Sequence, residues 1–156
     1  MKPAQPARIG TMTKNLTLRH AETEAEIRAC FPVMRQLRPR LQMPEDFLDA
    51  VMLQRGQGYR LLALWDDGKA VALAGYRRLD NLIHGRFLYV DDLITDAEGR
   101  GRGHGERLLQ ALCELGRTEG CQRLVLDTAL AKALAQRFYF RSGLLAKGLH
   151  FCMELQ

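Results

Sequence analysis

The sequence has no long apolar run. None of its segments approaches the roughly 20 consecutive apolar residues that a membrane-spanning helix requires. Its first residues also lack the continuous apolar stretch of a secretory signal. We therefore expect a cytoplasmic protein without a membrane partner, in which residues 1–14 are a mobile extension and residues 15–156 form a single domain.

Cysteine is scarce and scattered. The chain holds Cys30, Cys113, Cys121 and Cys152, with no C-x-x-C pair and no histidine at a metal-like spacing. This pattern predicts reduced thiols and no bound metal.

Blocks of one charge are absent as well. The formal net charge is +5, but the 23 Lys and Arg residues are spread along the chain among 18 acidic residues. Such a spread is typical of a solvated, mildly basic surface, so we expect no nucleic-acid partner. The charge would also suit a small anionic ligand that carries several phosphates.

What the sequence does contain is a regular change of hydrophobic period. Strand-like and helix-like segments follow one another in the order β, α, α, three strands, α, β, α, β. They cover residues 16–20, 21–39, 44–58, 59–78 (two strands joined by Asp66-Asp67-Gly68-Lys69), 85–95, 104–117, 122–129, 132–143 and 149–155. This order predicts a mixed α/β domain that is antiparallel in its first half and has a β-α-β crossover in its second.

Glycine is concentrated in one short stretch, "EGRGRGHGERLL", residues 98–109. Glycine at every second position from 99 to 105 destabilises regular structure, so another interaction must compensate. The run lies between a strand ending near Thr95 and a helix beginning near His104. Free N–H groups and missing Cβ atoms form an anion-binding concavity at such a place, and we predict a bound phosphate group.

Two familiar phosphate loops do not fit this stretch. The Walker pattern requires a Lys-Ser or Lys-Thr pair after the glycines, and the dinucleotide pattern fails at its third glycine, where Glu106 stands. The chain also lacks the long β-α alternation of a dinucleotide fold. A simple strand–helix connector is a further alternative, but it would need only one or two glycines.

The stretch resembles motif A of the GNAT superfamily of N-acetyltransferases. That motif is a strand followed by R/Q-x-x-G-x-G/A, which Arg100, Gly103 and Gly105 match, with Thr95 in place of the usual valine. Further along, "AQRFYFRSGL" resembles motif B, A-x-x-F-Y-x-x-x-G-F, with Leu144 in place of the final phenylalanine. The residues that match motif B are Ala135, Phe138, Tyr139 and Gly143.

The resemblance implies a GNAT-like fold that transfers the acetyl group of acetyl-CoA, its cosubstrate, to a primary amine. In the family, main-chain amides of motif A hold the pyrophosphate, and residues at the position of 126–129 line the pantetheine arm. His104 is expected to offer its N–H with its ring in solvent. The implied coenzyme-binding residues are Leu93, Ile94, Thr95, Arg100, Gly101, Arg102, Gly103, His104, Gly105, Glu106 and Phe138.

Tyr139 and an acidic pair are the candidate catalytic groups. The resemblance places Tyr139 beside the coenzyme sulfur as the acid, and the alternative is that it only packs. Adjacent strand residues point to opposite faces, so Asp91 and Asp92 are not expected to act as one site. In polyamine-type acetyltransferases, which this stretch resembles, an acidic pair serves the amine. We expect Asp91 to be the base, directly or through a water, with Asp92 as alternate; a structural hydrogen bond is equally open.

Nothing in the sequence identifies the acceptor. The acidic pair favours a small cationic molecule or a lysine-like amine, including that of a peptide, and an exposed edge strand makes a homodimer possible. Two other functions stay open. One is a CoA-binding sensor without turnover, and the less favoured one is a nucleic-acid-binding module that uses "GRGRG" as a clamp.

Overall fold

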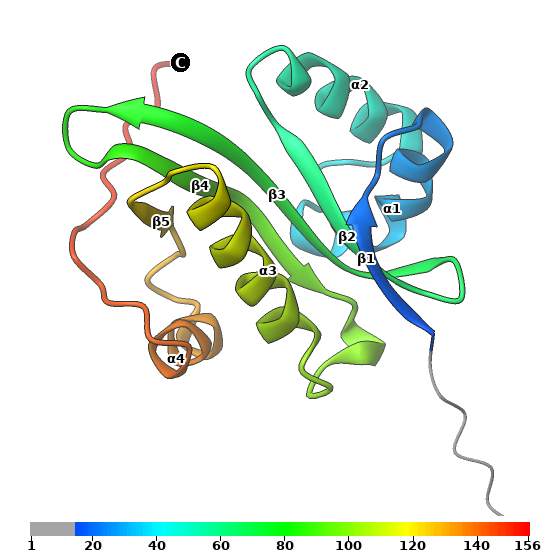
Figure 1. Cartoon of the computed structure of the whole chain (residues 1–156). Helices are drawn as coiled ribbons and strands as arrows, with labels where there is room; N and C mark the ends of the chain where they lie inside the picture. The colour runs from blue at the N-terminus through cyan, green and yellow to red at the C-terminus, as the bar shows by residue number, and fades with distance from the viewer. Residues whose placement is uncertain (1–14) are drawn as a thin grey trace, which may run out of the picture.

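The computed structural model describes residues 15–156, so the expected N-terminal extension, residues 1–14, lies outside the described residues. The elements follow the predicted order up to the last helix (Figure 1). They are β1 (Leu16–His20), α1 (Glu24–Leu37), α2 (Pro44–Arg55), β2 (Arg60–Asp66), β3 (Lys69–Asn81), β4 (Gly85–Thr95), the 3-10 helix η1 (Ala97–Gly99), α3 (His104–Thr118), β5 (Arg123–Leu126) and α4 (Ala133–Arg141). None of these helices has the length and apolarity to cross a membrane.

The strands form one sheet in the order β1-β2-β3-β4-β5. The first four strands pair antiparallel, and β5 pairs parallel to β4. Helix α3 makes the crossover between these two parallel strands, so the mixed sheet and the β-α-β crossover are confirmed. Figure 1 shows α1 and α2 on one face of the sheet and α3 on the other.

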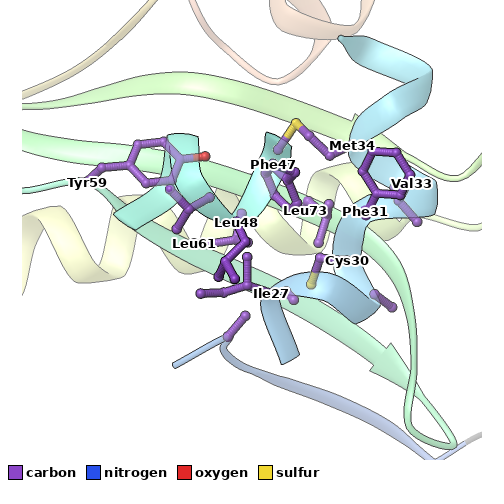
Figure 2. Packing of buried hydrophobic residues seen from close by; sticks show 14 of the residues in the cluster. Ile27, Cys30, Phe31, Val33, Met34, Phe47, Leu48, Tyr59, Leu61 and Leu73 are labelled. Carbon is purple, nitrogen blue, oxygen red and sulfur yellow. The ribbon is translucent and has the colours of Figure 1, made fainter. Parts of the chain in front are cut away.

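Alternation along β2 supplies both faces of the sheet with apolar side chains. Leu61, Ala63 and Trp65 pack with α1 and α2, whereas Leu62 and Leu64 pack in the cluster that contains α3. Figure 2 shows the first cluster, in which buried side chains of both helices meet the sheet. Each fully buried side chain of this size contributes about 1.5–3 kcal/mol, so the two clusters hold the sheet firmly between its helices.

β4 contains a β-bulge at Asp91. Tyr76 of β3 lies opposite Val90, but the residue before Tyr76 lies opposite Asp92, so Asp91 is an extra residue in β4. An extra residue shifts the alternation of the side chains that follow it. Val90 therefore packs in the α3-side cluster before the bulge, and Leu93 packs there after it.

The strand expected at residues 149–155 is not formed, and this prediction is wrong. Residues 144–156 have no regular structure. The apolar side chains that alternate in this segment are largely exposed: Leu149, Phe151, Met153 and Leu155. A period-two pattern indicates which side chains share a face, but a strand exists only where a partner completes its hydrogen bonds. Among the described strands, β5 pairs with β4 alone.

Candidate active site

The glycine run forms a tight turn between β4 and α3. After η1 the chain passes through Gly101 and Gly103 with φ angles of +75° and +77°. Residues with a Cβ rarely adopt this left-handed conformation, so the backbone shape explains glycine at both positions. A Cβ at either position would meet nothing within 4 Å, which leaves the space beside the turn open.

The N-terminus of α3 lies at this turn. Gly103 is the N-cap, and no described side chain caps the helix. The first N–H groups of a helix have no partner within it and carry partial positive charge. Arg100 and Arg102 are exposed beside them, and neither pairs with an acidic side chain in residues 15–156. The turn therefore has the amides and the positive charge that a diphosphate requires.

The ring of His104 is buried, so the expectation that it lies in solvent is wrong. The residue is 5 % exposed. A Cβ at Gly99 would lie 3.2 Å from its Nδ1, tighter than nearly all ordinary contacts. Glycine at position 99 thus makes room for the imidazole ring, which fills the inside of the turn.

Helix α4 brings the second motif against the turn. A Cβ at Gly105 would lie 3.5 Å from the Phe138 ring and 3.5 Å from the Thr95 hydroxyl. Tyr139 is half-buried in edge contact with Phe138, their ring centroids 5.4 Å apart. Burial raises the pKa of Tyr139 above its ordinary value. No described side chain hydrogen-bonds to its hydroxyl, so this group is a protonated donor without a partner in residues 15–156.

One edge of β4 is open near the end of the strand. Pairing with β5 stops at Val90 and Leu126, while β4 continues to Thr95. Residues 91–95 thus have β3 on one side and no described strand on the other, over a length of about 13 Å. The main-chain groups of such an edge can hydrogen-bond to an extended ligand.

A cleft of about 640 Å³ lies beside the start of this edge. Apolar side chains of α1 and α2, including Met34 and Phe47, line one side, and Asp91 and Asp92 line the other. The expectation that the two carboxylates point to opposite faces is wrong, because the bulge at Asp91 turns both toward the same face. The cleft has the size of a small-molecule site.

An arginine already binds each carboxylate. Arg77 donates two hydrogen bonds to Asp91, at 3.0 and 2.6 Å. Arg38 donates to the Asp92 carboxylate at 2.9 Å and to the main-chain oxygen of Asp91 at 2.9 Å. Both carboxylates thus make the structural bonds that the sequence left as an alternative. The pair therefore does not offer two free negative charges to a cationic acceptor.

Tyr59 completes this network. Its hydroxyl donates to the second oxygen of Asp92 at 2.9 Å, and its buried ring belongs to the cluster drawn in Figure 2. Burial, and then the charge of Asp92, raises the pKa of Tyr59 well above its ordinary value. Sequence reasoning missed Tyr59, Arg38 and Arg77, because these partners lie 14 to 54 positions from the carboxylates. The only signal was that a carboxylate within a strand needs a partner.

Tyr89 lines the cleft and connects it to the end of β5. Its hydroxyl donates to the carboxylate of Asp127, and His150 Nδ1 lies 3.5 Å from the same group. Burial, and then the bond to Asp127, raises the pKa of Tyr89 to about 12. This protonated hydroxyl holds the chain at the point where β5 ends.

The structure therefore brings most of the expected site residues together in two places. The turn gathers Thr95, Phe138 and the glycine run, and the cleft gathers the two carboxylates. Leu93 and Ile94 pack on opposite faces of the strand between them. Tyr139 is not among the residues that line the cleft. Within residues 15–156, no group of three or more His, Cys, Asp or Glu side chains could hold a metal ion.

Fold and site together define a class of enzyme. A turn suited to a diphosphate and a cleft suited to a small acceptor lie at the two ends of one open strand edge. This arrangement suits a group-transfer enzyme whose donor is a long, phosphate-bearing coenzyme.

The model of the Acetyltransferase (GNAT) family matches residues 21–144. The chain belongs to this family and is an acetyltransferase, as the two motifs indicated. It is 28 % identical over 109 residues to the "Uncharacterized N-acetyltransferase YhdJ" of Bacillus subtilis, covering 70 % of this chain and 77 % of that protein.

Two other similarities concern proteins with named acceptors. The chain is 36 % identical over 67 residues to glucosamine 6-phosphate N-acetyltransferase of Trypanosoma brucei brucei, covering 43 % of this chain and 44 % of that one. The match thus spans less than half the length of that relative. The structure of aminoglycoside N-acetyltransferase AAC(6')-Iy in complex with CoA is similar in fold, with a TM-score of 0.77 at 17 % identity. That similarity covers 92 % of this chain and 97 % of the other.

Proposed function

We propose that the protein transfers the acetyl group of acetyl-CoA to a primary amine of a small molecule or a peptide. The observation that carries this proposal is the open edge of β4, residues 91–95, between the glycine turn and the cleft. An extended coenzyme arm along this edge would bring a donor held at the turn to an acceptor held in the cleft.

The residues of the turn fit such a coenzyme. The space beside Gly101 and Gly103 is open, and the N-terminus of α3, with its free N–H groups and partial positive charge, lies next to it. Arg100 and Arg102 add charge-assisted hydrogen bonds to phosphate oxygens. Main-chain groups of residues 93–95 then lie in line to bind the arm, as the motif A resemblance implies.

When bound, acetyl-CoA supplies a thioester that the amine attacks, so that a C–N bond forms, the C–S bond breaks and a proton leaves the nitrogen. An alkylamine has a pKa near ~10.4, so freeing its lone pair at pH 7 costs about 4–5 kcal/mol without help from a base. Asp91 accepts this proton, directly or through a water. The two hydrogen bonds from Arg77 do not prevent Asp91 from accepting a proton, because each carboxylate oxygen has two lone pairs. Asp92, whose two oxygens are likewise both bound, is the alternate base.

Tyr139 donates a proton to the departing sulfur. Its pKa is raised by burial, so the hydroxyl is protonated at neutral pH and can act as an acid. Phe138, in contact with both Tyr139 and Gly105, positions this tyrosine relative to the turn.

The comparisons support an acceptor of small size. Relatives are named for glucosamine 6-phosphate and a structural neighbour for aminoglycosides, and both names describe amino sugars. The cleft volume of about 640 Å³ suits molecules of this kind. A homodimer, predicted from an exposed edge strand, stays a prediction.

A thiol-release assay with acetyl-CoA and a panel of amines, amino acids, aminoglycosides and peptides tests the proposal. Tyr139→Phe and Asp91→Asn should each lower kcat about tenfold to a hundredfold, since each removes one proton-transfer group. Tyr76→Phe and Asp49→Asn, which make the same changes outside the site, serve as controls. Coenzyme binding without thiol release for any acceptor would favour the sensor. Salt-dependent binding of random oligonucleotides would favour the nucleic-acid module.

A further inference from the structure

The charges that line the cleft do not balance. Asp91 is held by Arg77, and Asp92 by Arg38 and the hydroxyl of Tyr59. Arg40 lines the same cleft, and no acidic side chain within residues 15–156 pairs with it. Within residues 15–156, the cleft therefore contains one arginine without an acidic partner, Arg40, and each of its carboxylates already has a partner.

We propose that the acceptor amine also carries an anionic group, a phosphate or a carboxylate, which Arg40 binds in the cleft. This inference rests on the proposed function, because it concerns the second end of the molecule whose amine is acetylated. An arginine fork binds the oxygens of either anion through two parallel hydrogen bonds.

The position of Arg40 suits this role. It follows Arg38 and Pro39 in the segment between α1 and α2, and it lines the same cleft as the bulged residues of β4. The proline restricts the backbone of this segment. Arg38 is anchored by its bonds to Asp92 and to the main chain of Asp91, which leaves Arg40 as the free cation of the pair.

The same charges disfavour a polycationic acceptor. Extra ammonium groups in the cleft would approach Arg38 and Arg40 without gaining a free carboxylate. Like charges placed together in an interface repel, and this repulsion discriminates against such ligands. The apolar wall from Met34 and Phe47 would cover the carbon skeleton of either kind of acceptor and does not discriminate.

The test compares matched acceptors with the full chain and with two variants. Glucosamine 6-phosphate is compared with glucosamine, β-alanine with 3-amino-1-propanol, and kanamycin represents polycations. Wild-type kcat/KM should be about tenfold higher for the anionic member of at least one pair, and the pair that shows it identifies phosphate or carboxylate. Arg40→Gln should raise KM for that acceptor about tenfold and change KM for its neutral partner by less than about twofold.

Arg35→Gln is the matched control, because Arg35 is an exposed arginine of α1 that does not line the cleft. It removes the same charge and should leave both KM values unchanged. Calorimetric binding of glucosamine 6-phosphate and β-alanine without coenzyme is measured on all three proteins. The anionic amines could bind to the wild type, fail to bind to Arg40→Gln, and yet not be acetylated. That result would support the inference and refute the proposed function. A higher kcat/KM for the neutral amines or for kanamycin would overturn this inference and leave the proposed function standing. So would an Arg40→Gln variant that raises KM equally for the anionic and the neutral member of a pair.

Discussion

The side-chain amide of Gln36 joins the last turn of α1 to the start of the glycine turn. Its Nε2 donates to Oδ1 of Asp96 at 3.0 Å, and its Oε1 accepts from the main-chain N–H of Ala97 at 2.9 Å. Asp96 is buried, and the bond from Gln36 lowers the pKa of Asp96 below its ordinary value. Since α1 also lines the cleft, one side chain connects the wall of the cleft with the glycine turn.

Replacing Gln36 should weaken coenzyme binding. Gln36→Ala removes both hydrogen bonds, and the expected result is a KM for acetyl-CoA about tenfold higher with kcat changed less than about twofold. Steady-state kinetics with acetyl-CoA as the varied substrate measure this. Gln57→Ala, an exposed glutamine in the turn after α2, is the control and should change neither value. An unchanged KM in Gln36→Ala would show that the bridge does not position the turn.

Alanine at Gly103 should separate backbone strain from coenzyme binding. Gly103 and Gly58 have φ angles of +77° and +85°, and a Cβ at either would meet nothing within 4 Å. Each alanine variant should therefore lose about 1–2 kcal/mol of stability from the left-handed backbone alone. Only Gly103→Ala should also reduce acetyl-CoA affinity, by about tenfold, because its methyl group enters the space expected for phosphate. Urea unfolding and calorimetric titration measure the two effects, and equal affinity in both variants would contradict a phosphate site at the turn.

Gly75 is expected to be intolerant of any side chain. A Cβ at this position would lie 1.9 Å from the hydroxyl of Tyr59 and 2.4 Å from its ring, inside the cleft network. Gly75→Ala should reduce the free energy of unfolding by about 3 kcal/mol, at the upper end of overpacking costs. Tyr59→Leu removes the clashing atoms, so the double variant should be less destabilised than the sum of the single variants. Additive losses in chemical denaturation would show that the clash is not with Tyr59.

The pH dependence of the reaction should contain a contribution from Tyr139. Burial raises its pKa above the ordinary value of 10.0, so the folded protein holds this proton more tightly than the unfolded chain. The protonated hydroxyl of Tyr139 therefore contributes to the free energy of unfolding. This contribution is complete below pH 10 and is lost as the pH rises through the raised pKa. On the alkaline side of the pH profile, the decline of kcat should therefore begin only above pH 10 in the wild type, and Tyr139→Phe should lack this decline. Profiles of identical shape for the two proteins would exclude Tyr139 as the acid.

The fold was predictable where a signal lies in contiguous residues. The period change near Thr95, the glycines and the apolar face of α3 each depend on neighbours in sequence, so strand, turn and helix were all predicted. The prediction of a strand at residues 149–155 was wrong because alternation can be seen in adjacent residues, whereas the partner strand that it would need lies elsewhere in the chain. The same reason explains why the sequence indicated the glycine turn but not the surroundings of the two carboxylates. The turn is a local object, whereas the cleft is built from β4 and from helices far earlier in the chain.

By itself the sequence determined the order of the elements, and the left-handed glycines and helix N-terminus that form the turn after β4. Backbone conformation at these places depends on a few adjacent residues. Only the tertiary structure decided the surroundings of the carboxylates. Pairing register and packing between distant segments produce the bulge at Asp91 and the bonds from Arg38, Arg77 and Tyr59. They also place Arg40 in the cleft, without an acidic partner in residues 15–156. Contacts of this kind leave no periodic trace in one sequence, because they join residues far apart along the chain.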